Sequence, residues 1–302
     1  HEQEYESTSA KISGLIVRNF SRVFSRSDSS ESLDSFLRHN SIVGIADIDT
    51  RRLVTHIRDK GAMNAIISSE IHSPKELERL LDKCPPMEGL ELSTKVSTAT
   101  PYFHGNPMSP YRVAVLDVGV ERNILDCLAN RGCYLKVFPA TAKADELLSF
   151  DPHGVFISNG PGDPAAMPYA VETIQKLMDI DIPLLGICLG HQLLALANGV
   201  PTYKMHNGHR GANHPVKNIL TGKCEITSQN HGFGVSREKL EESPNVVVTH
   251  VNLNDDTVEG IRIRNRKAFS VQFHPEASPG PHDSHYLFDE IIRLMESDQV
   301  MA

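Results

Sequence analysis

The chain has 302 residues and a formal net charge of −8, with 40% hydrophobic and 23% charged residues. These are the values of an ordinary globular protein of about two domains, which excludes a disordered, collagenous or coiled-coil chain. The acidic balance argues against nucleic acid as a main partner. Five scattered cysteines, an odd number, argue against a disulfide scaffold and favour a reducing compartment.

The most apolar stretch of the sequence, residues 182–200, does not have the pattern of a membrane span. His191, Gln192 and Asn198 interrupt it, and a span needs about 20 mostly apolar residues. The N-terminal stretch HEQEYESTSA lacks the basic and apolar pattern of a signal peptide. We therefore expect a cytoplasmic protein that does not bind membranes.

The first 98 residues predict a small domain of mixed helix and strand. Helical patterns run over 31–39, 49–60 and 73–83, and residues 65–68 predict a strand. Residues 99–110 hold three prolines and a glycine without periodicity, so they predict a linker.

The second domain, residues 111–302, begins as a regular alternation of strands and helices. Strands are predicted over 112–118, 134–139, 155–158 and 183–188, and helices over 122–131, 142–150, 167–178 and 191–197. This alternation is typical of an α/β fold with a mostly parallel sheet flanked by helices. From Val216 onward we expect shorter strands and hairpins, followed by a closing helix over 284–296.

Cys188 carries the strongest local signal for chemistry. It stands at the join of a buried strand and a helix, between Gly186 and Gly190, in the thiol counterpart of a G-x-S-x-G nucleophile elbow. A helix N-terminus lowers the pKa of a nearby thiol, and the N–H that follows can stabilise an oxyanion. A buried, inert cysteine remains the alternative interpretation.

A nucleophilic cysteine needs a base, and His274 is the best of 15 histidines. It ends the apolar strand 268–273, and Pro275 stops that strand where catalytic groups of α/β proteins lie. Glu276 follows two residues later and could orient the imidazole. Taken alone, the pattern also suits a strand-end histidine beside an unrelated surface glutamate.

The third candidate element is the loop SNGPGDP, residues 158–164, between a predicted strand and a predicted helix. Its glycines, Gly160 and Gly162, expose backbone N–H groups that could cradle an anion or an oxyanion. A plain turn is the alternative. Neither a phosphate loop nor a dinucleotide fingerprint is present.

We predict no metal site on this chain. The pairs His206/His209 and His282/His285 have ligand-like spacing but lie in loops rich in glycine and proline, without a matching ligand set. The other cysteines are expected to be buried or incidental thiols: Cys84, Cys127, Cys133 and Cys224.

Four motifs occur in a fixed order along the chain: SNGPGDP, GICLGHQ, SQNHGF and QFHPEASPGP. In this order they resemble those of class I glutamine amidotransferases. With GHRGANHPVKN and ADIDTRRLVTHIRDKGA, they resemble the small, glutaminase subunits of carbamoyl phosphate synthetases, from about Gly14 to Met295. This resemblance implies a class I amidotransferase-like fold preceded by a smaller α/β domain.

The resemblance also implies roles for particular residues. Cys188 matches the nucleophile that attacks the glutamine amide, His274 the general base and acid, and Glu276 the residue that orients it. Gly162 and Leu189 match the N–H donors around the oxyanion. The residues that match glutamine-binding positions are Gly160, Gly162, Leu189, Gln192, Asn230, Gly232 and Phe233.

The resemblance further implies a partner. Ammonia would pass through a channel to a large subunit, which uses ATP, Mg²⁺ and bicarbonate to make carbamoyl phosphate for arginine and pyrimidine synthesis. No cofactor is then expected on this chain. The N-terminal domain, residues 1–98, corresponds to an incomplete version of the family's domain, and a glutamine-contacting serine has no counterpart here.

Two alternatives remain open at this point. The chain could serve a different synthetase, such as those for GMP or anthranilate, or it could be a binding module that keeps the fold without turnover. The N-terminal domain argues against the first alternative. Intact Cys188, His274 and Glu276 argue against the second.

Overall fold

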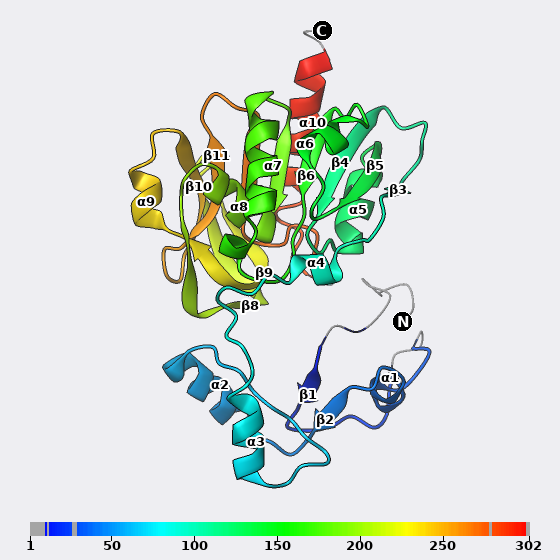
Figure 1. Cartoon of the computed structure of the whole chain (residues 1–302), viewed down its shortest axis with the longest axis vertical. Coiled ribbons are helices and arrows are strands. Elements are labelled where there is room, and N and C mark those ends of the chain that lie inside the picture. The colour runs from blue at the N-terminus through cyan, green and yellow to red at the C-terminus, as the bar shows by residue number, and fades with distance from the viewer. Residues whose placement is uncertain (1–9, 11, 26–28, 278–279, 300–302) are drawn as a thin grey trace. The chain divides into compact units, whose positions relative to one another are not determined.

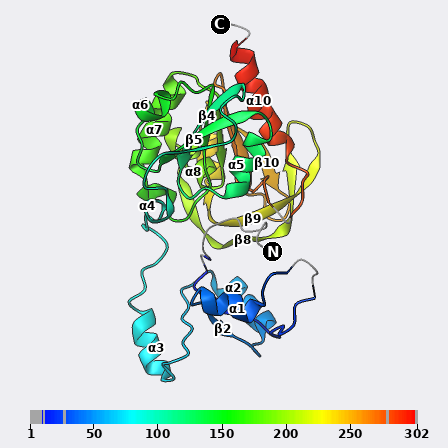
Figure 2. The same ribbon diagram turned by 90° about the vertical axis from the view of Figure 1, so that its right-hand side faces the viewer.

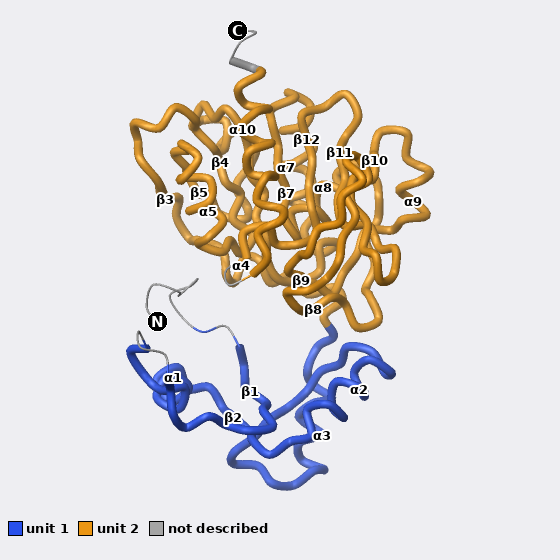
Figure 3. The backbone as a smooth tube through the Cα atoms, turned by 180° about the vertical axis from the view of Figure 1, so that it is seen from behind, with its two compact units in different colours: residues 1–86 blue, residues 87–302 orange. Residues whose placement is uncertain are grey.

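The computed structural model describes residues 10, 12–25, 29–277 and 280–299. The chain separates into two compact units, residues 1–86 and 87–302 (Figure 3). Most of the N-terminal stretch HEQEYESTSA, and residues 278–279 of the QFHPEASPGP motif, lie outside the described residues. Across the described ranges, no helix has the length and apolar character needed to cross a membrane.

The described residues of the first unit form a small parallel sheet and three helices. β1 (Gly14–Ile16) pairs with β2 (Val43–Ile45), and the helices are α1 (Leu33–His39), α2 (Thr50–Lys60) and α3 (Pro74–Leu81). The three helices confirm the sequence prediction for this region.

Two strands of the first unit were missed, and one was predicted wrongly. β1 and β2 are three residues long, too short to show a periodic pattern. Residues 65–68 form no strand. The Ile67 side chain instead packs over Gly14, with Cδ1 2.9 Å from the position that a Cβ would take there. Apolar residues in this segment therefore signal packing rather than backbone pairing.

In the second unit, the described residues build one mixed sheet of ten strands, ordered β3-β5-β4-β6-β7-β12-β11-β10-β8-β9. Its central strands, from β5 to β12, run parallel, and antiparallel strands lie at both ends. The strands are β3 (Tyr102–His104), β4 (Tyr111–Asp117), β5 (Cys133–Pro139), β6 (Gly154–Ile157), β7 (Leu184–Ile187), β8 (Thr202–Asn218), β9 (Cys224–Val235), β10 (Val246–Asn252), β11 (Val258–Ile263) and β12 (Ala268–Val271).

Helices cover both faces of this sheet. The helical segments are α4 (Ser93–Val96), α5 (Arg122–Ala129), α6 (Ala144–Leu148), the 3₁₀ turn η2 (Pro164–Ala166), α7 (Pro168–Asp179), α8 (Leu189–Ala197), α9 (Arg237–Glu241) and α10 (Tyr286–Gln299). Buried residues of α6, α7 and α8 share one core cluster with one face of the sheet. Buried residues of α5 and α10 share a second cluster with the other face, which gives three layers (Figures 1 and 2). The predicted α/β class is confirmed.

Residues 99–110, for which the sequence predicts a linker, belong to the second unit. Within them β3 pairs antiparallel with β5 and forms one edge of the large sheet. Phe103 stacks on Tyr134, with ring centroids 5.3 Å apart. Three residues of strand are enough to attach this proline-rich segment to the sheet.

The prediction that strands resume only at Val216 was wrong, because β8 begins at Thr202. Asn207-Gly208 and Gly211 have the composition of a loop. In the structure they lie where the β8–β9 register shifts, between Lys204 and His209 and between Gly211 and His214. Irregular strands of this kind tolerate glycine, which is why composition alone misassigned the segment.

Candidate active site

The carboxyl ends of three neighbouring parallel strands define the candidate site. β6, β7 and β12 lie side by side, with Ile157 opposite Gly186 and Ile187 opposite Val271. The chain after β6 is the SNGPGDP loop, the chain after β7 is Cys188, and the chain after β12 leads to His274. Sites of α/β proteins lie at this edge of the sheet.

Cys188 occupies a strained turn between β7 and α8. Its φ of 53° and ψ of −103° are rare for a residue with a side chain. A Cβ on Gly186 would lie 2.6 Å from the Gly190 carbonyl oxygen, and a Cβ on Gly190 would lie 2.3 Å from that of Ile157. Both glycines are therefore required by close backbone approach, as the G-x-C-x-G spacing predicts.

His274 and Glu276 form a buried pair. His274 Nδ1 lies 2.7 Å from Glu276 Oε1, and the two residues are 7% and 1% exposed. The backbone N–H of His274 donates to the backbone carbonyl of Ser228 in β9, and Asn123 Nδ2 donates to the backbone carbonyl of Glu276. These bonds hold the chain after β12 in place.

The electrostatics of His274 connect it to Cys188. Burial lowers the pKa of His274, but the Glu276 carboxylate and the Cys188 sulfur outweigh it, so that the pKa lies well above its usual value. Nε2, the ring nitrogen not bonded to Glu276, has no hydrogen-bond partner among the described residues. The arrangement can therefore hold a proton on the imidazole beside the sulfur.

The SNGPGDP loop contributes backbone rather than side chains. Gly162 has a φ of 105°, and a Cβ on Gly160 would lie 1.9 Å from the Val118 carbonyl oxygen. The same Cβ would lie 3.1 Å from Leu189 Cδ2, so Gly160 borders the first residue of α8. The Asp163 carboxylate fixes the loop by accepting from Ala165 N and Gly89 N.

The remaining predicted residues gather around β9. Gln192, one turn after Cys188 in α8, donates from Nε2 to the Phe233 carbonyl at 2.9 Å and to Gln272 Oε1 at 3.0 Å. Asn230 is exposed, Gly232 is partly buried, and Phe233 is buried. The Ser228–His274 bridge joins this strand to the His274–Glu276 pair. All ten predicted residues thus belong to elements that meet at one region of the second unit.

The structure changes the interpretation of the predicted histidine pairs. His206 and His209 lie in strand β8 rather than in a loop, His206 exposed and His209 buried, so they do not form a ligand pair. The rings of His282 and His285 contact each other at a tilt of 32°, with centroids 4.5 Å apart, just before α10.

Sequence reasoning missed the true partner of His209. Cross-strand register places His209 opposite His231, and both lie near the buried Glu259. These three side chains, and separately Glu121, His274 and Glu276, are close enough within each group to hold a metal ion. In the sequence, the larger residues Gln229, His231 and Phe233 alternate with smaller ones, and this period-two pattern could have placed His231 on the buried face of a strand.

Comparisons with known proteins agree with this geometry. The class-I glutamine amidotransferase family model matches residues 114–294, and the carbamoyl-phosphate synthase small chain, CPSase domain, model matches residues 1–67. The first match covers the candidate site, and the second covers most of the first unit.

Curated relatives match nearly the whole chain. The carbamoyl phosphate synthase small chain of Chlorobaculum tepidum is 50% identical over 293 residues, covering 96% of this chain and 80% of the relative. That of Salmonella typhimurium is 45% identical, covering 96% and 80%. The pyrimidine-specific small chain of Lactiplantibacillus plantarum is 44% identical, covering 98% and 79%.

A solved structure supports the fold of the second unit. A Thermoplasma acidophilum protein described as a component of GMP synthase aligns with a TM-score of 0.55 and 22% identity, over 63% of this chain and 96% of that one. At this identity the likeness concerns the fold alone.

Proposed function

The chain belongs to the family of carbamoyl-phosphate synthase small chains, and we propose that Cys188 is the nucleophile with which it hydrolyses glutamine. The observation that supports this role most strongly is the strained turn of Cys188 beside the buried His274–Glu276 pair. Membership in the family makes the chain the glutaminase component of an amidotransferase. The mechanism below is our proposal.

In the proposed reaction, His274 takes the thiol proton and Glu276 stabilises the imidazolium. The Cys188 thiolate attacks the side-chain amide carbon of glutamine, and the carbonyl oxygen becomes an oxyanion. Leu189 is the first residue of α8, so its N–H has no acceptor within the helix and can serve this oxyanion. Gly162 N–H is proposed as the second donor.

The tetrahedral intermediate then collapses. The C–N bond breaks, His274 returns the proton to the departing nitrogen, and ammonia leaves behind a glutamyl thioester on Cys188. Water, deprotonated by His274, hydrolyses the thioester to glutamate and restores the thiol. His274 passes on each proton that it accepts, first to the departing nitrogen and then to the Cys188 sulfur, so the proposed cycle needs no cofactor on this chain.

The substrate pocket is proposed to lie between the SNGPGDP loop, the start of α8 and β9. Gly160 and Gly162 would present backbone atoms, and Gln192 would hold the Phe233 carbonyl while lining the site. The full proposed set of glutamine-binding residues is Gly160, Gly162, Leu189, Gln192, Asn230, Gly232 and Phe233.

We also propose the partner of the reaction. A small chain implies a large chain, which would receive the ammonia and use ATP, Mg²⁺ and bicarbonate. The match of residues 1–67 to the small-chain domain supports this partner over the synthetases for GMP or anthranilate.

Thiol alkylation tests the nucleophile assignment. Glutamine should slow the alkylation of Cys188 in the native chain, whereas the exposed Cys84 and Cys224 should react at the same rate with or without it. Cys133 is the internal control for an inert thiol, because burial raises its pKa to about 12. Alkylation of Cys188 that glutamine leaves unchanged would overturn the assignment.

A further inference from the structure

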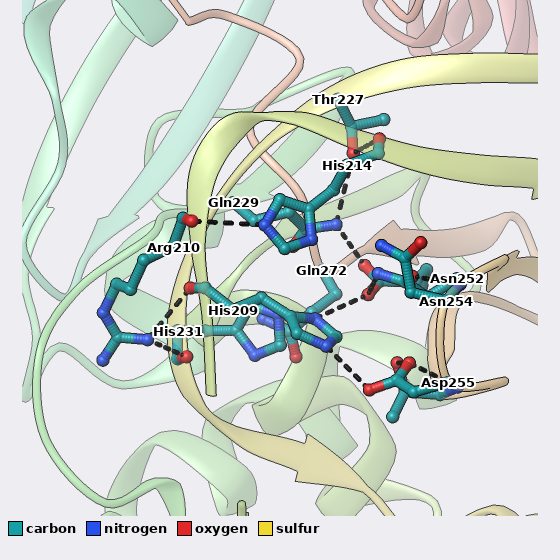
Figure 4. A network of polar contacts seen from close by, with 12 residues as sticks. His209, Arg210, His214, Thr227, Gln229, His231, Asn252, Asn254, Asp255 and Gln272 are labelled. Atoms are coloured by element: carbon teal, nitrogen blue, oxygen red, sulfur yellow. Dashed lines mark hydrogen bonds and ion pairs between the residues drawn. The ribbon is translucent and has the colours of Figure 1, made fainter. Parts of the chain in front are cut away.

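A largely buried cluster of titratable side chains surrounds His231, which lies in the segment 230–233 proposed to bind glutamine (Figure 4). His209 of β8 faces His231 of β9, and Glu259 of β11 and Asp255 of the β10–β11 turn complete it. Glu259 is fully buried, and His209 and His231 are 7% and 6% exposed. The mechanism above uses none of these four side chains, yet His231 stands between Asn230 and Gly232.

The hydrogen bonds of His231 fix its tautomer. Nδ1 lies 2.8 Å from the Phe233 carbonyl oxygen, which can only accept, so Nδ1 carries a proton. Burial lowers the pKa of His231 to about 4, so the ring is neutral near pH 7. Its Nε2 therefore presents a bare lone pair toward His209.

The surroundings of His209 require protons on both of its ring nitrogens. Nε2 lies 2.9 Å from Asp255 Oδ2, and Nδ1 lies 3.1 Å from His231 Nε2 and 3.2 Å from Glu259 Oε1. Each of these partners is an acceptor, and a bare Nδ1 would face both a lone pair and a carboxylate. His209 is therefore an imidazolium. Burial alone would lower the pKa of His209, but the nearby Glu259 and Asp255 carboxylates have the larger effect and raise it.

The rest of the environment is compatible with this charge. Glu259 accepts from Gln229 Nε2 at 2.9 Å and from Asn252 Nδ2 at 3.1 Å, so its carboxylate is well solvated by the protein. Among the described residues, His214 lies close to His209, with its ring centroid 5.2 Å away, and the Arg210 guanidinium donates to the His209 carbonyl. Tyr203 lies near the two carboxylates, and burial together with Asp255 and Glu259 raises its pKa.

We propose that His209 is a positioning residue for glutamine: as an imidazolium it donates to His231 and thereby holds the 230–233 segment in its binding geometry. The Phe233 carbonyl accepts from both His231 Nδ1 and Gln192 Nε2. The chain of hydrogen bonds thus runs from Asp255 and Glu259 through both histidines to α8, one turn from Cys188. This inference rests on the proposed glutaminase function.

Two substitutions at His209 distinguish the effect of its hydrogen bond to His231 from the effect of its packing. In His209→Asn the amide nitrogen replaces Nδ1 and can still donate to His231. In His209→Gln the amide reaches toward Asp255, and the donor to His231 is lost. We expect His209→Gln to raise the KM for glutamine about tenfold, equivalent to about 1.4 kcal/mol, with kcat changed less than twofold. His209→Asn should recover most of the affinity.

The positive charge of His209 is tested with Glu259→Gln. This substitution keeps the shape of the side chain at 259 but removes the negative charge that faces His209. The wild-type KM for glutamine should stay constant below the pKa of His209 and rise above it, and the variant should show this rise at lower pH. Glu225→Gln is the matched control, because Glu225 is also a buried carboxylate but bonds to Tyr286 and Asn218, away from this cluster. It should leave the pH profile of KM unchanged.

Histidine ¹⁵N NMR of the full chain gives a readout independent of turnover. We expect both His209 nitrogens to be protonated at pH 7 and the His231 Nε2 to be bare. A neutral His209, a wild-type KM in His209→Gln, or a stoichiometric metal ion bound to His209, His231 and Glu259 would overturn the proposal. If the wild-type complex lacked glutaminase activity while the NMR result held, the proposed function would fail instead.

Discussion

Replacing Gly190 with alanine perturbs the Cys188 turn without replacing any group of the proposed reaction. The new Cβ would lie 2.3 Å from the Ile157 carbonyl oxygen and 2.9 Å from its carbonyl carbon. Real Cβ contacts essentially never fall below 3.0 Å, so α8 and β6 must separate by about 3.0 − 2.3 = 0.7 Å. Overpacking of this kind costs about 1–3 kcal/mol of stability.

The shift displaces the start of α8, including Cys188 and the Leu189 N–H. Because a misplacement of about 1 Å can cost about 100-fold in rate, we expect kcat for glutamine hydrolysis to fall about 10–100-fold. The assay compares kcat and KM for glutamine in the complex with the large subunit, and thermal unfolding confirms that the variant is folded.

Gly44→Ala is the matched control for this experiment. Its Cβ would lie 3.6 Å from Leu37 Cδ1, an ordinary contact, and Gly44 lies in the first unit. Glutaminase kinetics should not change. A folded Gly190→Ala variant with wild-type kcat would refute the claim that this close approach sets the position of the nucleophile.

Two further predictions concern the His274–Glu276 pair and stability in acid. His274→Asn should reduce kcat for glutamine more than Glu276→Gln, because in the proposed mechanism His274 moves the protons and Glu276 orients it. The reverse order in steady-state kinetics would contradict these roles. Burial lowers the pKa values of His191, His231 and His250 to about 3, 4 and 4, against about 6.5 in an unfolded chain. Between these pH values the histidines bind protons in the unfolded chain but not in the folded chain. The free energy of unfolding therefore decreases as the pH falls from about 6.5 toward 4, by up to about 1.4 kcal/mol per pH unit for each histidine. Urea unfolding as a function of pH measures this slope, and a midpoint constant between pH 6.5 and 4 would show that these rings are not buried neutral.

The regular part of the fold was predictable because its signals are local. The buried strand before Cys188 and the glycines around it specify a strand, a sharp turn and a helix, and the structure shows all three. Pro275 predicted that the strand before it ends at residue 273; β12 ends slightly earlier, at Val271, and the topology places that end beside β7. Sequence patterns could assign these elements because each spans only a few residues.

The rest depends on pairing between distant segments, which composition does not reveal. β8 begins at Thr202, fourteen residues before Val216, where the sequence pattern first predicts a strand. Two register shifts allow Asn207-Gly208 and Gly211 to lie within this strand. The same register brings His209 to His231, 22 residues later in the chain. Glycine and histidine in this stretch therefore suggested a loop, although the register buries His209 against His231 and Glu259.

The central claim is that Cys188 serves only to produce ammonia for a large-subunit partner, and Cys188→Ser tests it most directly. The variant complex is assayed for carbamoyl phosphate synthesis with glutamine and, separately, with ammonium salt. We expect the glutamine-dependent reaction to fall to background and the ammonia-dependent reaction to continue at the wild-type rate. Substantial turnover of glutamine, or loss of the ammonia-dependent reaction in an intact complex, would contradict the account.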